Sequence, residues 1–233
     1  MSIDATVTVN PRRHHHGLRP PRHSDVNDAV VFVLDDDASV RRGLGRLLTS
    51  AGYRAESFAS PSEFLARRPH DGPACLVLDL RMPGMNGLEL QERLDGSGRP
   101  VPIVFITGHG DIPTSVQAMR KGAVDFLPKP FTDVELLGAV QTALERDRMS
   151  LGSRAEMREL RERFDTLTPR ERQVFLLVAD GLLNKQVAGR LGTAEKTVKA
   201  HRAKVMEKMG AATFADLVRM AGTLRRRPGE KSA

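Results

Sequence analysis

Several apolar segments of this chain end in residues whose side chains could take part in acid, metal or anion chemistry. Three segments lead to acids or a hydroxyl at their carboxyl ends, and a fourth leads to a lysine. Together, such groups could bind a hard divalent ion and an anion, and one carboxylate could act as a nucleophile. In chain order, the residues are Asp35 and Asp36, Asp79, Thr107 and Lys129.

Each side-chain type in this set has a definite chemical use. Mg²⁺ prefers a few carboxylate oxygens and keeps several waters, so Asp35, Asp36 and Asp79 are candidate ligands. The ion would reduce repulsion between Asp79 and an incoming phosphoryl group, which Asp79 could then attack and hold as an acyl phosphate. Lys129 could pair with the phosphoryl oxygens, and the Thr107 hydroxyl could donate a hydrogen bond to one of them.

A simpler alternative is that acids at strand ends only cap the loops that follow. This interpretation is sufficient for Asp37, the third acid of the run that begins at Asp35. It does not explain why suitable residues stand at the ends of four different segments. The pattern therefore favours one shared site.

The elements that would position these residues alternate between strands and helices from residue 29 to residue 147. Five strands alternating with five helices predict an α/β fold, a doubly wound parallel sheet covered on both faces, with its site where the strands' carboxyl ends converge. The expected strands are residues 30–34, 53–57, 75–78, 103–106 and 123–127. The expected helices are residues 38–51, a short helix from Ser60 or Ser62, residues 86–94, residues 111–121, and residues 132–147 with Thr132 as N-cap.

The rest of the chain shows a purely helical pattern. Residues 148–162 are charged and predict a linker helix, and residues 163–224 predict a second, smaller, all-α domain of four helices. The run from Thr168 to Glu171 is a capping box with proline at the first helical position. Asn184 is the expected cap of the next helix, a third helix is expected from about 195 to 209, and Thr213 opens the fourth.

The third of these helices has one apolar and one cationic face. Together with the helix before it, it has helix-turn-helix spacing, which suits a helix placed in the major groove of DNA. A solvated surface helix is the alternative, because cationic faces are common. The apolar positions are Val198, Val205 and Met209, and the polar face includes Lys196, Thr197, Lys199, His201, Arg202, Lys204 and Lys208.

Charge and composition agree with this division. Residues 1–147 carry 17 basic and 19 acidic residues, a net charge of −2, whereas residues 148–233 carry 19 and 10, a net charge of +9. A basic segment attracts polyanions, of which nucleic acid is the commonest. No apolar run approaches membrane-spanning length, and the single cysteine, Cys75, lies in an apolar strand pattern, so we expect a cytoplasmic protein without a membrane partner. Residues 1–28 and 225–233 are predicted to be disordered tails.

Residues 29–147 resemble the receiver domain of bacterial two-component response regulators, in the FixJ-like and StyR-like branch. The resemblance implies that Asp79 is the phosphoacceptor and that Asp36, Asp79 and the Arg81 carbonyl bind Mg²⁺, with Asp35 helping through water. It also implies that Thr107 and Lys129 contact the phosphoryl group, that Phe126 is the switch aromatic, and that a cis bond follows Lys129. The motifs are Val31-Phe32-Val33-Leu34-Asp35-Asp36, Asp79-Leu80-Arg81-Met82-Pro83-Gly84-Met85-Asn86-Gly87, Thr107-Gly108-His109-Gly110-Asp111 and Gly122-Ala123-Val124-Asp125-Phe126-Leu127-Pro128-Lys129-Pro130-Phe131.

Residues 163–224 resemble the LuxR-type four-helix DNA-binding domain. The resemblance implies DNA contacts by Thr197, Lys199, His201 and Arg202, backbone contacts by Lys185 and Lys208, and a dimerisation helix from Thr213. The sequence departs from the family pattern at Ala194, where a serine N-cap is usual, and at Gly189 inside a helix. The motifs are Leu167-Thr168-Pro169-Arg170-Glu171-Arg172-Gln173-Val174, Gly181-Leu182-Leu183-Asn184-Lys185-Gln186-Val187-Ala188, Lys196-Thr197-Val198-Lys199-Ala200-His201-Arg202 and Lys208-Met209.

The two resemblances imply a phosphorylation-controlled transcription factor, not an enzyme, that most simply activates transcription. Its expected partners are promoter DNA, a sensor histidine kinase, a second copy after phosphorylation, and RNA polymerase. One alternative is a phosphohydrolase with an aspartyl nucleophile, which would need a second acid where Arg81 stands. The other is a DNA-binding protein whose receiver no longer accepts phosphate, and the full set of acids, Thr107 and Lys129 argues against it.

Overall fold

The computed structural model describes residues 28–96, 100–108 and 112–225. Nearly all of both predicted tails, and His109 to Asp111 of one receiver motif, therefore lie outside the described residues. Contacts divide the chain between Leu144 and Glu145 into two compact units. No helix in the described part of the chain has the length and apolar character needed to span a membrane.

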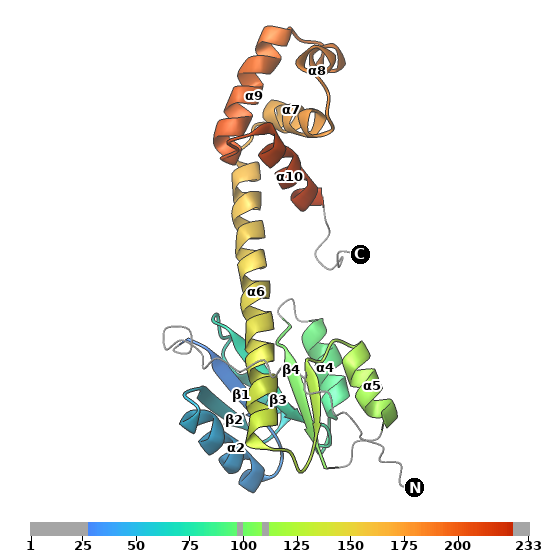
Figure 1. Ribbon diagram of the computed structural model, residues 1–233. Coiled ribbons are helices and arrows are strands. Elements are labelled where there is room, and N and C mark those ends of the chain that lie inside the picture. The colour runs from blue at the N-terminus through green and yellow to red at the C-terminus, as the bar shows by residue number, and fades with distance from the viewer. Residues whose placement is uncertain (1–27, 97–99, 109–111, 226–233) are drawn as a thin grey trace, which may run out of the picture. The chain divides into compact units, whose positions relative to one another are not determined.

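The first unit is built on a five-stranded sheet in which every neighbouring pair of strands is parallel. The strand order is β2-β1-β3-β4-β5 (Figure 1), which confirms the predicted doubly wound fold. Each predicted strand is present, with ends that differ by at most two residues. The strands are β1 (Val30–Leu34), β2 (Arg54–Phe58), β3 (Ala74–Asp79), β4 (Ile103–Thr107) and β5 (Asp125–Pro128).

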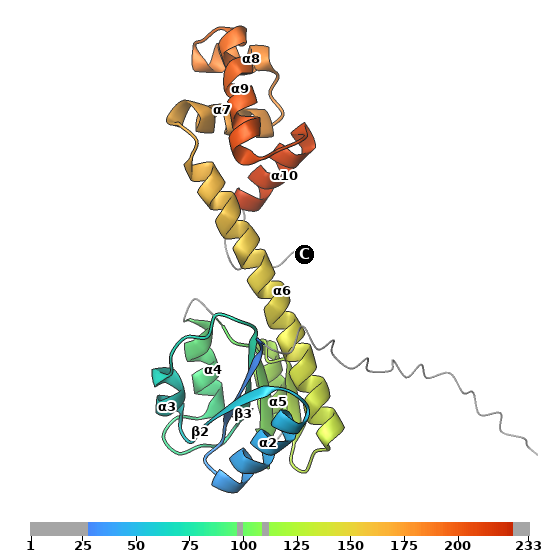
Figure 2. The same cartoon turned by 90° about the vertical axis from the view of Figure 1, so that its left-hand side faces the viewer.

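Helices cover both faces of this sheet (Figure 2). Four of them begin at a side-chain cap that satisfies free backbone N–H groups: Asp37, Ser60, Asn86 and Thr132. Asp37 therefore caps a helix, as the simpler alternative in the sequence analysis suggested for this acid. The helices are α2 (Ala38–Ser50), α3 (Pro61–Ala66), α4 (Gly87–Asp95), α5 (Ile112–Arg120) and α6 (Asp133–Asp165).

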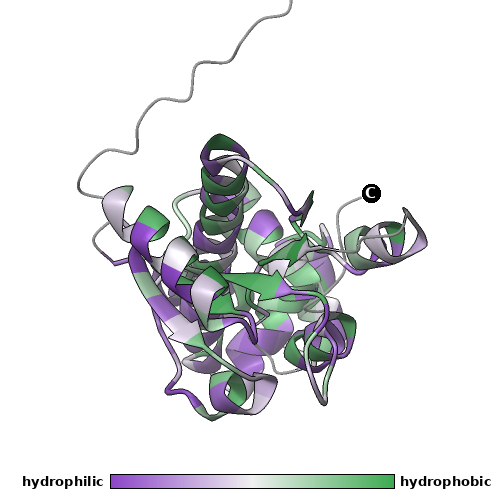
Figure 3. Cartoon of the chain, turned by 90° about the horizontal axis from the view of Figure 1, so that it is seen from below, coloured by the Kyte–Doolittle hydropathy of each residue, from purple (hydrophilic) through white to green (hydrophobic). Residues whose placement is uncertain are grey.

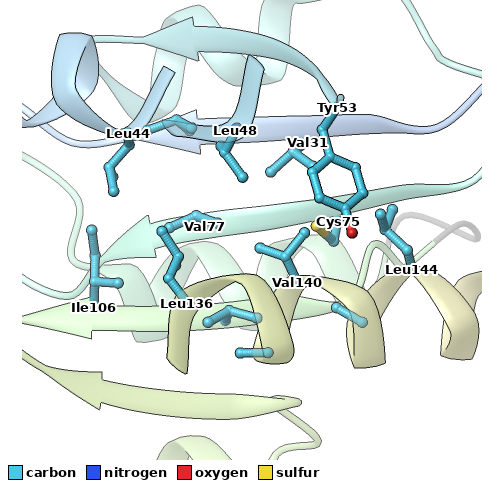
Figure 4. Packing of buried hydrophobic residues seen from close by; sticks show 14 of the residues in the cluster. Val31, Leu44, Leu48, Tyr53, Cys75, Val77, Ile106, Leu136, Val140 and Leu144 are labelled. Atoms are coloured by element: carbon cyan, nitrogen blue, oxygen red, sulfur yellow. The ribbon is translucent and has the colours of Figure 1, made fainter. Parts of the chain in front are cut away.

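Alternate residues of the central strands supply two separate cores, because successive side chains of a strand point to opposite faces. One core joins Val31 and Val77 of the sheet to α2 and α6, and Figure 4 shows Leu136, Val140 and Leu144 of α6 directed toward the strands. The other core joins the remaining strand residues to α3, α4 and α5. The central strands are accordingly the hydrophobic, green centre of Figure 3. Because both faces of the central strands are buried, the strands are held in place in the sheet. The site residues at the strand ends are therefore held in place as well.

Helix α6 is one continuous helix of 33 residues, where the sequence predicted a receiver helix ending at 147 and a separate linker helix. Thr132 caps its start by accepting a hydrogen bond from the Glu135 backbone N–H. Nothing in residues 148–162 breaks the helix: Gly152 is the one glycine, and proline is absent.

The second unit contains four further helices around one apolar core, in agreement with the predicted all-α domain. Thr168 forms the predicted capping box with Glu171. The prediction that Asn184 caps a helix is wrong: Leu183 holds the cap position and Asn184 is the first helical residue. Ala194 caps the following helix without a side-chain hydrogen bond. The helices are α7 (Pro169–Ala179), α8 (Asn184–Leu191), α9 (Glu195–Met209) and α10 (Phe214–Arg225).

Candidate functional site

Two buried acids at adjacent strand ends share one lysine. Asp79 is the last residue of β3, and Asp35 follows β1, the strand paired with it. The Lys129 Nζ donates hydrogen bonds of 2.8 Å to Asp35 Oδ2 and 2.9 Å to Asp79 Oδ1. The structure therefore brings together three of the predicted site residues, from segments separated by 50 and 94 positions along the chain.

Lys129 is held as a cation by these acids. Burial alone would lower the pKa of Lys129, but the hydrogen bonds and charges of Asp35 and Asp79 outweigh burial and raise the pKa above its ordinary value. The side chain remains 27% exposed, whereas that of Asp79 is 10% exposed. A positive charge thus stands beside the carboxylate at the edge of the site, where it can also meet an incoming anion.

The third acid, Asp36, is exposed, and no hydrogen bond reaches its carboxylate from the described residues. Its backbone is held by Arg41, whose guanidinium donates bonds of 2.7 Å to the Asp35 carbonyl and 2.9 Å to the Asp36 carbonyl. Because Arg41 binds the two backbone carbonyls, it leaves the Asp36 carboxylate available. Sequence reasoning missed Arg41; its place in the second turn of α2, facing back to the acidic loop, was the only signal.

Thr107 and Arg81 complete the surroundings of Asp79. Thr107 is the buried last residue of β4, and its carbonyl accepts a 2.7 Å bond from the Lys129 backbone N–H. The peptide bond from Lys129 to Pro130 is cis, as predicted. The backbone N–H of Arg81 donates a 2.8 Å bond to Asp79 Oδ2, and its side chain is exposed. Both oxygens of the candidate acceptor are therefore oriented by neighbours.

The predicted switch residue, Phe126, is half-buried on β5. Its ring centroid lies 6.2 Å from that of Phe105, with 40° between the ring planes. This separation lies within the range of aromatic pairs that stabilise each other. Phe126 is thus neither a fully buried core residue nor a free surface residue.

The acids have the donor chemistry that Mg²⁺ requires. No three His, Cys, Asp or Glu side chains among the described residues are arranged to hold a metal ion by themselves. Mg²⁺ is nevertheless usually held by only one or two carboxylates and keeps several waters. Asp36, with its exposed carboxylate, and Asp79, at the neighbouring strand end, fit this requirement, and both supply hard oxygen ligands.

The predicted DNA-contacting residues of the second unit fall into three groups: exposed residues, a half-buried histidine, and two cations that contact other helices. Lys185, Thr197 and Lys199 are exposed, and Lys199, whose Nζ lies 3.6 Å from Glu195 Oε1, remains 65% exposed. His201 is half-buried, and its Nδ1 has no hydrogen-bond partner in the described part of the chain. The first group is free to meet a ligand.

Arg202 and Lys208 instead contact other helices of the same unit. Arg202 donates a 3.3 Å hydrogen bond to Asn184 Oδ1, and its guanidinium lies 5.1 Å from the centre of the Phe214 ring. The Lys208 Nζ lies 2.6 Å from Glu171 Oε2. The sequence pattern does not show these neighbours, and DNA contact by Arg202 and Lys208 stays a prediction.

Two family models match the chain. Residues 31–141 match the response regulator receiver domain, and residues 165–221 match the bacterial regulatory proteins of the luxR family. Nodulation protein W of Bradyrhizobium diazoefficiens is 52% identical over 84% of this chain and 86% of its own. The response regulator protein TodT of Pseudomonas putida is 43% identical over 88% of this chain and 90% of its own.

A solved structure of the response regulator StyR is similar as well, with a TM-score of 0.74 and 49% identity over 84% of this chain and 98% of that one. The fold, the paired acids and the helical unit thus define a receiver domain joined to a DNA-binding domain. The chain belongs to the two-component response regulators with a LuxR-type DNA-binding domain, which are transcription regulators and not enzymes. Arg81, where a phosphohydrolase would carry an acid, agrees with this assignment.

Proposed function

We propose that Asp79 accepts a phosphoryl group from a sensor histidine kinase and that this modification controls binding of promoter DNA, most simply to activate transcription. The observation that carries the proposal is the position of Asp79, oriented by Lys129 and the Arg81 backbone at the carboxyl edge of the sheet. This edge is where ligands bind in open α/β folds.

Each neighbour of Asp79 has a role in this proposal. Asp36, Asp79 and the Arg81 carbonyl would hold Mg²⁺, with Asp35 acting through water. The bound ion would supply positive charge that reduces repulsion between the attacking carboxylate and the phosphoryl oxygens. Lys129, already positively charged, pairs with the transferred group, and the Thr107 hydroxyl donates a hydrogen bond to it.

In the same proposal, phosphorylation changes the surface that pairs with a second copy. Movement of Thr107 toward the phosphoryl group leaves space that Phe126 fills, which changes the face formed by α5 and β5. Helix α5 carries two exposed apolar side chains, Val116 at 43% and Met119 at 45% exposure, which suit such a contact. The modification therefore biases a two-state equilibrium.

The DNA contacts of the proposal come from the second unit. Lys199, Thr197 and His201 on α9 would lie in the major groove, and Lys185 on α8 would contact the backbone. A dimer would match a two-fold symmetric site, and the bound protein would recruit RNA polymerase. The exposure of Lys185, Thr197 and Lys199 supports this arrangement.

Incubation of the full chain with radiolabelled acetyl phosphate and Mg²⁺ tests the acceptor. We expect one labelled site, lost in Asp79→Asn and lost on chelation of the metal. Asp37→Asn is the matched control: it removes a nearby acid but keeps a good helix cap, so labelling should persist. Label that survives Asp79→Asn would assign the phosphoryl group to another residue.

A further inference from the structure

Lys208, in the last turn of α9, is engaged inside the helical unit. Its Nζ lies 2.6 Å from Glu171 Oε2 and donates a 3.2 Å hydrogen bond to the Thr166 carbonyl. Its side chain is 33% exposed, against 65% for Lys199 on the same helix. The two lysines therefore differ in what they can offer to a ligand.

The acid that holds Lys208 is itself buried and committed. Glu171 is 3% exposed, and its Oε2 also accepts a 2.9 Å bond from the Thr168 backbone N–H, as part of the capping box of α7. Movement of Lys208 to a phosphate would leave this buried carboxylate without its cation, an arrangement that proteins strongly avoid. The pair thus joins the end of α9 to the start of α7.

A second cation holds the same turn of α9. The Arg163 guanidinium donates a 3.2 Å bond to the Met209 carbonyl, at the negative end of the helix dipole. The next residue, Gly210, has a φ of 66°, and a Cβ there would lie 2.7 Å from Arg163. Glycine therefore permits this close approach, and the end of α9 is fixed by Arg163 and by Lys208.

We propose that Lys208 is a positioning residue, which holds α9 in the orientation that presents Lys199 to DNA, and that it makes no phosphate contact of its own. The inference rests on the proposed function of α9 as the DNA-contacting helix. In this proposal, Lys208 fixes the orientation of α9, and the exposed cations of the same helix contact the DNA.

Four full-length proteins test the proposal by anisotropy with a fluorescein-labelled mixed-sequence duplex at several salt concentrations. The variants are Lys208→Met, Glu171→Gln with Lys208→Met, and Lys199→Gln, compared with the unmodified chain. The salt slope of log K reports the number of neutralised phosphates, about 0.9 per phosphate. Hydrogen exchange of peptides covering residues 168–210 reports whether the helical unit is intact.

We expect Lys208→Met to bind DNA more weakly and to exchange faster, because it leaves the Glu171 charge unpaired. The double variant removes that charge, and its glutamine can still complete the capping box, so affinity and exchange should return to nearly the unmodified values with an unchanged salt slope. Lys199→Gln should lose about 0.9 of the slope with unchanged exchange.

A double variant that stays weak, or that loses slope, would overturn the positioning role. If α9 does not contact DNA and the proposed function fails, the result is different. Lys199→Gln would then keep the full salt slope, whatever the binding of the Lys208 variants. The double variant also covers the case in which Lys208→Met alone does not fold.

Discussion

At the scale of single residues, two buried carboxylates that pair with lysine differ in how exposed the lysine is and in what else they bind. Glu171 uses Oε2 for Lys208 and for the α7 cap, and its side chain is 4% exposed. Asp79 is held by Lys129, a partner that it shares with Asp35 and that is 27% exposed. Both partners of Glu171 lie inside the helical unit, which suits a structural pair, whereas the more exposed Lys129 is placed to meet an incoming anion.

The pH dependence of Glu171 follows from its contacts. The Lys208 hydrogen bond and the Thr168 backbone N–H lower the pKa of Glu171 from 4.5 to about 2. A carboxyl whose pKa is lower in the folded state stabilises the fold above its unfolded pKa and loses that contribution as pH falls toward the folded value. We therefore expect the stability contributed by Glu171 to be complete above pH 4.5 and to be lost between 4.5 and about 2.

Carbon-detected nuclear magnetic resonance titration of the Glu171 carboxyl in the full chain measures this directly. Lys208→Met should move the midpoint toward or above the ordinary value, since the largest cause of the lowered pKa is removed. An unmoved Glu171 midpoint in the variant would show that Lys208 is not its principal partner.

At the scale of elements, the sequence predicted what depends on local signals. The strands, the capping box at Thr168 and the cap of α6 at Thr132 were predictable, because apolar period and cap chemistry lie within a few residues. Asn184 was misassigned because a polar residue before an apolar run can either cap the helix or bind a distant side chain. Its oxygen binds Arg202, a residue 18 positions away.

The acid site was predictable for a related reason. Parallel strands with buried faces bring their carboxyl ends to one edge, so Asp35, Asp79 and Lys129 had to lie close together once the strands were recognised. The contacts of Arg41 and Lys208 could not be predicted in this way. They depend on side-chain direction and on the packing of particular helices, which periodicity does not specify.

The start of α9 is a place where one substitution should stabilise the element. Ala194 has the extended backbone of an N-cap, with φ −78° and ψ 146°, but no oxygen to accept a hydrogen bond. Ala194→Ser should add about 1 kcal/mol to the free energy of unfolding of the helical unit, because serine satisfies one free N–H of the first turn. Slower amide exchange in the first turn of α9 would be the direct readout.

Ala200→Ser is the matched control for this substitution. Ala200 is exposed within the same helix, away from either end, so its hydroxyl has no free N–H to bind. We expect it to be neutral or slightly destabilising, since serine has the lower helix propensity. Equal stabilisation by both substitutions would exclude capping as the cause.

At the scale of the whole molecule, charge is distributed by function. The net charge is −2 over residues 1–147 and +9 over residues 148–233, so nearly all attraction for a polyanion resides in the part that contains the helical unit. Joining two copies through the acidic-to-neutral part would place two basic units on one duplex. The second would then bind as an intramolecular event at high effective concentration.

Dimerisation should therefore change the salt dependence of DNA binding as well as the affinity. With Mg²⁺ and beryllofluoride, a phosphoryl mimic, we expect the mass in solution to rise from that of one 25.6 kDa chain toward two. The salt slope of binding to a duplex long enough for both copies should about double, because twice as many phosphates are neutralised. Asp79→Asn should keep the monomer mass and the smaller slope under the same conditions, while retaining the monomer's DNA binding. A mass that doubles without a steeper slope would mean that only one helical unit of the dimer meets DNA, and a slope that steepens equally in Asp79→Asn would separate dimerisation from the acceptor altogether.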